Sequence, residues 1–341
     1  MTKEKSGRNI WLDLFKFFLC YLIICIHLAG ESYPHYPVYR LAVPMFFIIS
    51  GYFNYHKNNE ILSKKTVGFI KRTLRYMLIG FLIYIVFDFF MCYVRDMGVG
   101  YYFTTLFYED FILEFLILNR PISYSGAQLW FLIALFVVSL IHYLLVKFQK
   151  THWYKILIPV CFLIYFFFTG YMHLLQYTDM PVRYTRNALF FGLPNFALGF
   201  TLAKYDFHKK SWYKYLYLLL GIAFFFLQIL ENQIFENTLA DPEMYISGVL
   251  SAVYLLLFFL GLKKTNCGGY YRWCGKSASF YIYIFHMAVA VVLELFFTFN
   301  NLLFKCLIVL LLSFAIYEIC FLIGKGVVYW KNKKCLNEVS V

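Results

Sequence analysis

The sequence contains few charged residues for its length. Aspartate, glutamate, lysine and arginine make up 14% of the 341 residues, whereas hydrophobic residues make up 62%, and the mean hydropathy is +0.66. A chain of this composition cannot cover a water-soluble domain of ordinary kind with polar side chains. The composition therefore excludes an ordinary soluble protein and predicts an all-α, polytopic membrane protein.

The sequence also lacks the features that separate domains. No internal repeat, low-complexity tract or linker rich in Gly, Ser or Pro divides it, so we expect one membrane domain over residues 1–341. Basic residues precede the first apolar stretch, but Lys16 interrupts that stretch and no small-residue cleavage pattern follows cleanly. This pattern predicts a retained first span, not a cleaved signal peptide.

Cysteine usage gives no sign of a crosslinked secreted chain. The chain has nine cysteines, and most fall within the predicted spans, with none in the predicted external loops. A disulfide framework is therefore not expected. Cys267 and Cys274 share a predicted cytoplasmic loop, but their spacing fits no usual zinc pattern and no histidine lies between them, so no metal site is predicted.

Apolar segments of spanning length recur along the whole chain, and they predict about ten transmembrane helices around a polar central cavity. The predicted spans are 10–29, 38–55, 69–92, 129–147, 153–172, 187–204, 212–231, 243–262, 278–298 and 302–325. An even number of spans places both termini on the same side of the membrane.

The lysines and arginines indicate which side that is. All but seven of the 31 basic residues lie on one side of the ten-span arrangement; the seven are Lys16, Arg40, Arg95, Arg120, Arg183, Arg186 and Lys305. The positive-inside rule therefore predicts that both termini are cytoplasmic. The rule also explains the net charge of +13, so no nucleic-acid partner is expected.

Arg40, Arg186 and Lys305 stand at the predicted outer ends of spans, where the positive-inside rule gives no reason for a cation. In one interpretation, these cations bind a charged group of the substrate or pair with another residue of the protein. In the alternative interpretation they snorkel at the membrane interface.

The first span carries three ionisable residues, Asp13, Lys16 and His27. At about 100° and 1.5 Å per residue, Lys16 and His27 lie on one helix face, roughly 16 Å apart in depth. Asp13 precedes Lys16 by one turn and can pair with it. An ionisable residue within a span costs roughly 2.5 to 3.5 kcal/mol, so this face is expected to line a protein interior or water. In the alternative interpretation, Asp13 and Lys16 lie at the cytoplasmic interface of the membrane and His27 at the outer interface, and they only fix the orientation of the span.

Two further stretches combine polar residues with membrane depth. The stretch RLAVPMFFIISGYFNY, which begins at Arg40, places Pro44, Ser50 and Gly51 in an apolar span, which allows a polar wall or simply close helix packing. Arg72 and Arg75, three residues apart, share a face at the cytoplasmic end of the third span. Such a pair can hold phosphate through forked hydrogen bonds, although basic residues at this position also follow from topology alone.

These stretches resemble the integral-membrane acyltransferase-3 family, bacterial proteins that acylate mostly cell-surface carbohydrates. Arginine is commoner in the family at the position of Lys16. The matching stretches, in order over nearly the whole chain, are Asp13, Lys16 and His27; Arg40 with VPMFFIISGY; Arg72 with Arg75; Gln128 to Leu132, QLWFL; Arg186 and Asn187 with LFFGLPNFALGF; and Ser279 to His286, SFYIYIFH.

The resemblance implies a multi-pass protein of the bacterial plasma membrane with no bound cofactor. It would transfer an acetyl group from cytoplasmic acetyl-CoA, the donor substrate, to a hydroxyl of a surface polysaccharide or its lipid-linked precursor. Its partners would be the lipid bilayer and the glycan acceptor; the sequence predicts no oligomeric state.

The reaction needs a base with a pKa near 7, and His27 is the first candidate, as base or as a transiently acylated relay. Asp13 and Lys16 would set the electrostatics, and Arg72 and Arg75 would hold donor phosphates. The candidate residues for the cavity and acceptor are Arg40, Ser50, Trp130, Arg186, Asn187, Glu231 and His286. His286 either assists or only packs.

Two other classes of function remain open at this point. Polar residues in interior helices also serve carriers, which would pass a small molecule or an acylated glycolipid across the membrane without catalysis. The basic pair Arg72 and Arg75 favours the enzyme, because a carrier of neutral solutes has no need of it. A purely structural assembly partner is the third possibility.

Overall fold

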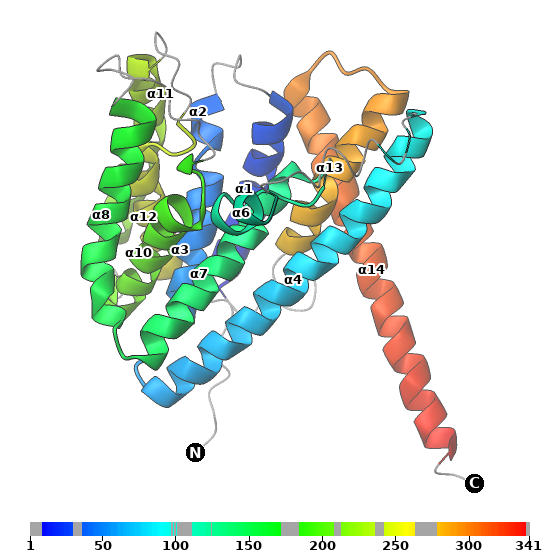
Figure 1. Cartoon of the computed structure of the whole chain (residues 1–341), viewed down its shortest axis with the longest axis horizontal. Helices are drawn as coiled ribbons and strands as arrows, with labels where there is room; N and C mark the ends of the chain where they lie inside the picture. Colours follow the sequence, from blue (N-terminus) through cyan, green and yellow to red (C-terminus); the bar gives the residue numbers. More distant parts are fainter. Residues whose placement is uncertain are drawn as a thin grey trace. The chain divides into compact units, whose positions relative to one another are not determined.

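The computed structural model describes residues 9–29, 36–96, 98, 100, 111–123, 125–171, 184–207, 213–235, 242–262 and 278–338. Every regular element in these ranges is helical, and none of the described residues forms a strand (Figure 1). The predicted all-α class is therefore confirmed for this part of the chain. The chain forms two compact units, residues 1–29 with 265–341, and residues 30–264.

The first unit contains α1 (Ile10–Ala29), α13 (Ala278–Phe296) and α14 (Leu302–Glu338), and α1 packs against both of the other helices. α1 starts after Asn9, whose side-chain oxygen accepts a hydrogen bond from the Leu12 amide at 3.1 Å. This bond satisfies one of the amides that a helix start leaves open. The rings of Phe17 and Phe314, 5.6 Å apart, join α1 to α14.

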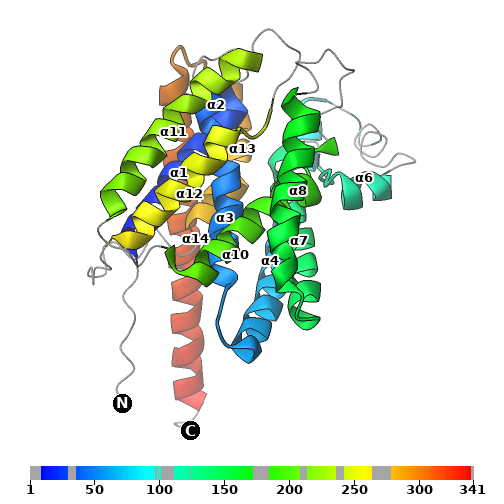
Figure 2. The ribbon, with the colours of Figure 1, turned by 90° about the vertical axis from the view of Figure 1, so that its left-hand side faces the viewer.

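The second unit is built from paired helices. Helix α3 packs against α10 and α12, α11 against α12, α4 against α7, and α8 against α10 (Figure 2). Its elements are α2 (Tyr36–Tyr39), α3 (Ala42–Asn54), α4 (Asn59–Val94), α6 (Phe111–Ile117), η1 (Ala127–Leu129), α7 (Trp130–Lys147), η2 (Thr151–Trp153), α8 (Tyr154–Phe166), η3 (Phe167–Tyr171), η5 (Ala188–Gly192), α10 (Leu193–Tyr205), α11 (Lys214–Phe235) and α12 (Ile246–Gly261).

An aromatic cluster joins α3, α7 and η5 within the second unit. The ring of Phe47 lies 4.7 Å from that of Phe131 and 6.0 Å from that of Phe191, and Trp130 meets Phe191 edge-on at 5.6 Å. Edge-on aromatic pairs add to the stabilisation that comes from burial. The cluster therefore fixes the indole of Trp130 at the start of α7.

Helices α3 and α10 cross so closely that each needs a glycine at the contact. A Cβ atom added to Gly51 would lie 1.9 Å from the backbone oxygen of Phe196, and one added to Gly199 would lie 1.9 Å from that of Ile48. Backbone atoms cannot move aside as a flexible side chain can. The predicted role of Gly51 in close helix packing is therefore confirmed.

We expect Gly51→Ala and Gly199→Ala to destabilise the protein, because the new methyl group forces the two backbones apart. Overpacking of this kind costs about 1 to 3 kcal/mol. The measurement is the thermal unfolding of each detergent-purified variant. Gly68→Ala is the matched control, because a Cβ there meets nothing within 4 Å and alanine favours a helix over glycine by about 1 kcal/mol. If all three variants unfolded at the same temperature as the wild type, the close contact between the backbones of α3 and α10 would be contradicted.

Among the residues that the structure describes, seven helices are long and apolar enough to cross a membrane, and they match seven of the ten predicted spans. They are Ile10–Ala29, Asn59–Val94, Ala127–Lys147, Thr151–Thr169, Lys214–Ile234, Ala278–Phe296 and Leu302–Ile323. The other three predicted spans coincide with α3 and α10, of 13 residues each, and with α12, of 16 residues. The count of ten spans, the central cavity and the cytoplasmic termini stay predictions.

Helix α4 is much longer than the span predicted at 69–92. It starts at Asn59, because the side chain of Asn58 accepts a hydrogen bond from the Ile61 amide and caps the helix. Its 36 residues correspond to about 54 Å, against about 30 Å for the hydrocarbon core of a bilayer. We therefore expect its basic N-terminal half, which carries Arg72 and Arg75, to reach beyond the hydrocarbon core.

Candidate functional site

The ion pair predicted in the first span is present in α1. Lys16 Nζ lies 3.2 Å from Asp13 Oδ1, one turn apart on the same helix face. Asp13 is buried and Lys16 is partly buried. A buried carboxylate and its ammonium partner lower each other's cost of burial, and this explains how the first span carries both charges.

His27, at the other end of α1, lies against a second histidine, His286 of α13. Their ring centroids are 5.3 Å apart, and the rings are tilted by 38°. The two helices also meet two turns earlier in each, where Cys20 Sγ approaches the backbone oxygen of Ser279 at 3.8 Å. The structure thus brings together two histidines that the sequence places in its first and its ninth predicted spans.

The hydrogen bonds of His286 fix the position of its proton. His286 Nδ1 lies 2.8 Å from the backbone oxygen of Tyr283 and 3.2 Å from that of Ile282. Because a carbonyl oxygen only accepts hydrogen bonds, Nδ1 carries the hydrogen and donates it, and Nε2 has a lone pair. His286 is fully buried, and Nε2 has no hydrogen-bond partner among the described residues. Nε2 is therefore a buried hydrogen-bond acceptor that no described residue uses.

A third buried histidine, His142 of α7, shows the contrast. Its Nε2 contacts Thr66 Oγ1 at 3.3 Å, and its Nδ1 contacts the hydroxyl of Tyr154 at 2.8 Å. Both ring nitrogens are therefore occupied by neighbours within the second unit. His142 has the contacts of a structural residue.

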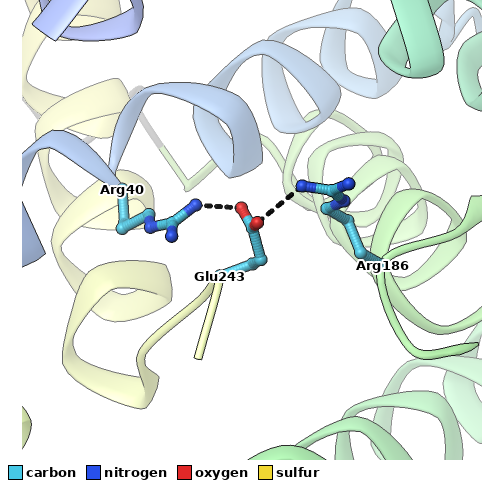
Figure 3. A network of polar contacts seen from close by, with 3 residues as sticks. All are labelled: Arg40, Arg186 and Glu243. Atoms are coloured by element: carbon cyan, nitrogen blue, oxygen red, sulfur yellow. Dashed lines mark hydrogen bonds and ion pairs between the residues drawn. The ribbon is translucent and has the colours of Figure 1, made fainter. Parts of the chain in front are cut away.

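The second unit contains a bridged ion pair, which we call the arginine–glutamate cluster (Arg40, Arg186 and Glu243). Arg186 Nη1 donates to Glu243 Oε1 at 2.7 Å, and Arg40 Nη1 donates to Glu243 Oε2 (Figure 3). Arg40 lies in the turn between α2 and α3, Arg186 precedes η5, and Glu243 lies in the connection before α12. The cluster therefore joins three segments that are distant in the sequence.

Glu243 is the residue of this cluster that was not predicted from the sequence. The predicted eighth span began at residue 243, whereas α12 begins at Ile246, so Glu243 stands outside the apolar helix. The sequence did contain a signal for a carboxylate partner. Arg40 and Arg186 lie at predicted outer helix ends, where the positive-inside rule does not explain a cation. The predicted internal pairing is confirmed for Arg40 and Arg186, and also for Lys305, whose Nζ lies 2.5 Å from Glu294 Oε1.

The protonation of Glu243 is controlled by its two partners. Burial acts to raise the pKa of Glu243, but the nearby guanidinium groups of Arg40 and Arg186 outweigh burial and lower the pKa below 4.5. The carboxylate is therefore ionised at neutral pH. Its bonds contribute stability that is fully present above the unfolded-state pKa and is lost as the pH falls through the lower folded-state pKa.

We expect the unfolding temperature of the wild type to fall when the pH drops below about 4.5. Glu243→Gln should remove this part of the pH dependence, because the amide does not titrate. At neutral pH the variant should be less stable, by less than the about 3 to 5 kcal/mol of a fully buried pair, since Arg186 is partly exposed. The measurement is thermal unfolding of both proteins across this pH range; parallel profiles would contradict the assignment.

Trp130 and Asn187 hold Arg186 and its helix in place. The guanidinium of Arg186 lies over the Trp130 ring, 5.3 Å from its centroid. The side-chain oxygen of Asn187 accepts hydrogen bonds from the amides of Leu189 and Phe190 at 2.9 and 3.0 Å, and so caps η5. Both residues were predicted near the acceptor, and the structure places them next to the arginine–glutamate cluster.

Arg72 and Arg75 are exposed on α4, one turn apart. Arg72 lies over the ring of Phe69 and Arg75 over that of Tyr76, each at 5.6 Å from the centroid. Within the described chain, neither guanidinium has a carboxylate partner, in contrast to Lys64, whose Nζ lies 2.6 Å from Glu60 Oε1. The two arginines are therefore available to an anion from outside the helix.

Two other predicted cavity residues have local contacts. The carboxylate of Glu231 in α11 accepts hydrogen bonds from the amides of Ile246 and Ser247, each at 2.8 Å, and from the Ser247 hydroxyl. These are the contacts of a residue that caps the start of α12. The backbone oxygen of Ser50 accepts a hydrogen bond from the Asn54 side chain at 2.7 Å.

Among the described residues, no group of three or more His, Cys, Asp or Glu side chains could hold a metal ion. Cys267 and Cys274 lie outside the described residues. Because Arg40 belongs to the second unit, the cavity predicted to join Lys16, His27 and Arg40 stays a prediction.

Long apolar helices that carry paired ionisable side chains define an integral-membrane protein of the all-helical class. A family profile described as an acyltransferase domain matches residues 9–324, nearly the whole chain. The chain belongs to this acyltransferase-3 family, and this membership supports acyl transfer as its activity. No curated protein and no solved structure matches the chain.

Proposed function

We propose that the protein is a membrane O-acyltransferase that moves an acetyl group from cytoplasmic acetyl-CoA to a hydroxyl of a cell-surface polysaccharide or its lipid-linked precursor. The observation that carries this proposal beyond the family is the pair His27 and His286. It places a buried imidazole, whose Nε2 is an open hydrogen-bond acceptor, beside a second imidazole in a helix that also carries the Asp13–Lys16 pair. A histidine pair of this kind suits proton removal from an alcohol.

The acceptor hydroxyl is a weak nucleophile at neutral pH, so the reaction needs a base. In the direct route, its oxygen attacks the acetyl carbon, His27 takes the hydroxyl proton, and the carbon–sulfur bond breaks. The CoA thiolate leaves and takes up the proton. In the relay route, His27 first accepts the acetyl group from CoA, and the hydroxyl then removes it.

His286 supports His27 in this proposal. Its Nε2 lone pair, kept free by the hydrogen bonds at Nδ1, can accept a hydrogen bond from the His27 ring once that ring carries the proton. Asp13 and Lys16 contribute the local charge balance in α1. Arg72 and Arg75 hold phosphate groups of the donor, for which forked guanidinium bonds are well suited.

The topology of the proposal follows from the basic residues. Ten spans with both termini in the cytoplasm place Arg72 and Arg75 on the side where acetyl-CoA is present, and Arg40 and Arg186 on the outer side. We propose the bacterial plasma membrane as the location. In this arrangement Arg72 and Arg75 bind the donor on the cytoplasmic side, and Arg40 and Arg186 lie on the side of the acceptor.

The decisive experiment incubates the purified protein with radiolabelled acetyl-CoA and cell-envelope fractions. We expect label in a glycan, released by mild alkali as an ester is. A carrier would instead move an already acylated molecule across a vesicle membrane and leave acetyl-CoA intact. Unlabelled glycan in the presence of folded protein would contradict the proposed enzyme.

A further inference from the structure

The guanidinium of Arg186 is held firmly but keeps binding capacity. One nitrogen donates to Glu243 at 2.7 Å, and one face covers the Trp130 ring. Within the described chain these are its only polar or ring contacts. The side chain is 37% exposed, whereas Arg40 is 4% exposed. Because a guanidinium offers five N–H donors, Arg186 presents unused donors to the solvent.

The arginine–glutamate cluster places two cations on one carboxylate. Two guanidinium groups share the single carboxylate of Glu243, so the three side chains leave a net charge of +1. Arg40 is buried, whereas Arg186 is the exposed member of the cluster. The guanidinium of Arg186 is therefore the one that an anion from outside can reach.

We propose that Arg186 is an oxyanion-binding residue that recognises an acceptor carrying a carboxylate or a phosphate group. The open donors of Arg186 match the forked geometry of such a group. Glu243 and Trp130 hold the guanidinium in position before the ligand arrives, which lowers the entropy cost of binding. This inference rests on the proposed function, since it specifies the class of acceptor.

Two chemical sources can supply the oxyanion. One is the carboxylate of an acidic sugar in the glycan, and the other is the phosphate of a lipid-linked precursor. Both give charge-assisted hydrogen bonds to a guanidinium, and both bind more weakly as salt screens the charges. A neutral glycan attached to no phosphate offers neither.

The test measures equilibrium binding by thermophoresis with full-length protein in phosphatidylcholine nanodiscs. The probes are a hexuronic acid oligosaccharide, the same oligosaccharide with its carboxyl groups reduced to alcohols, and a polyprenyl diphosphate. We expect salt-sensitive binding of the first or the third probe, and binding of the reduced oligosaccharide that is at least about tenfold weaker. The probe that binds identifies the source of the oxyanion.

Variants then assign the binding to the side chain. Arg186→Gln should weaken the binding about ten- to a hundredfold, the usual effect of losing a charge-assisted hydrogen bond. Arg186→Lys keeps the charge but loses the fork and should fall in between. The matched control is Arg120→Gln, which removes an arginine already paired with Glu114 at 2.8 Å and should bind like the wild type.

Equal binding by Arg186→Gln, Arg120→Gln and the wild type would overturn the inference. So would the absence of salt-sensitive binding of both anionic probes, or binding of the reduced oligosaccharide as tight as that of the tighter anionic probe. The result is independent of acyl transfer, because no donor is present. If the anionic probe depends on Arg186 but acetyl-CoA never labels a glycan, the proposed function fails and the binding site stands. If the enzyme acetylates charged and neutral acceptors alike, the proposed function stands and the inference fails.

Discussion

His27→Ala should abolish acyl transfer while leaving the protein inserted and folded. A base that removes the proton of the attacking hydroxyl contributes about 10² to 10⁴ in rate, and an acylated relay contributes at least as much. His27 stands in α1 against His286, whose Nε2 can accept a hydrogen bond from the protonated His27 ring. The measurement is transfer of radiolabelled acetyl per folded molecule, with thermal unfolding of variant and wild type recorded alongside.

Two other histidines provide the controls for this result. His286→Ala should also slow transfer, because the protonated His27 ring would lose its neighbouring hydrogen-bond acceptor; a larger loss there than in His27→Ala would assign the base to His286. His142→Ala should lower stability by about 1 to 3 kcal/mol without changing activity per folded molecule, since both of its ring nitrogens have structural partners. If His27→Ala keeps more than about a tenth of wild-type activity, His27 is not the base.

Arg72→Ala and Arg75→Ala should weaken donor binding more than they slow the bound complex. Both guanidiniums are exposed on α4, and neither has a carboxylate partner among the described residues, so a phosphate would meet no competitor. Losing one charge-assisted contact to phosphate should raise the KM for acetyl-CoA about ten- to a hundredfold, with a smaller change in kcat. Steady-state kinetics over a range of acetyl-CoA concentrations measures both parameters.

The matched control on the same helix is Lys64→Ala. It removes a cation near the same helix end, but one that is paired with Glu60 at 2.6 Å. We expect its KM to stay near that of the wild type. An unchanged KM in both arginine variants would show that these residues serve topology alone.

The sequence alone determined the helical class, the positions of seven apolar helices and the ion pair of α1. These features depend on local properties: the length of an apolar run, and the spacing of Asp13 and Lys16 by one helical turn. The sequence also showed that Arg40, Arg186 and Lys305 have no topological reason for their positions. It could not name their partners, because charge counting places residues on a side of the membrane without pairing them.

Only the tertiary structure brought Glu243 between Arg40 and Arg186, and His286 against His27. Each contact joins segments far apart in the chain, and helical periodicity says which face a residue occupies but not which helix it meets. The same reason explains Glu231. A carboxylate at membrane depth suggested a place in a cavity, whereas the packing of α11 beside α12 directs it to the open amides that begin α12.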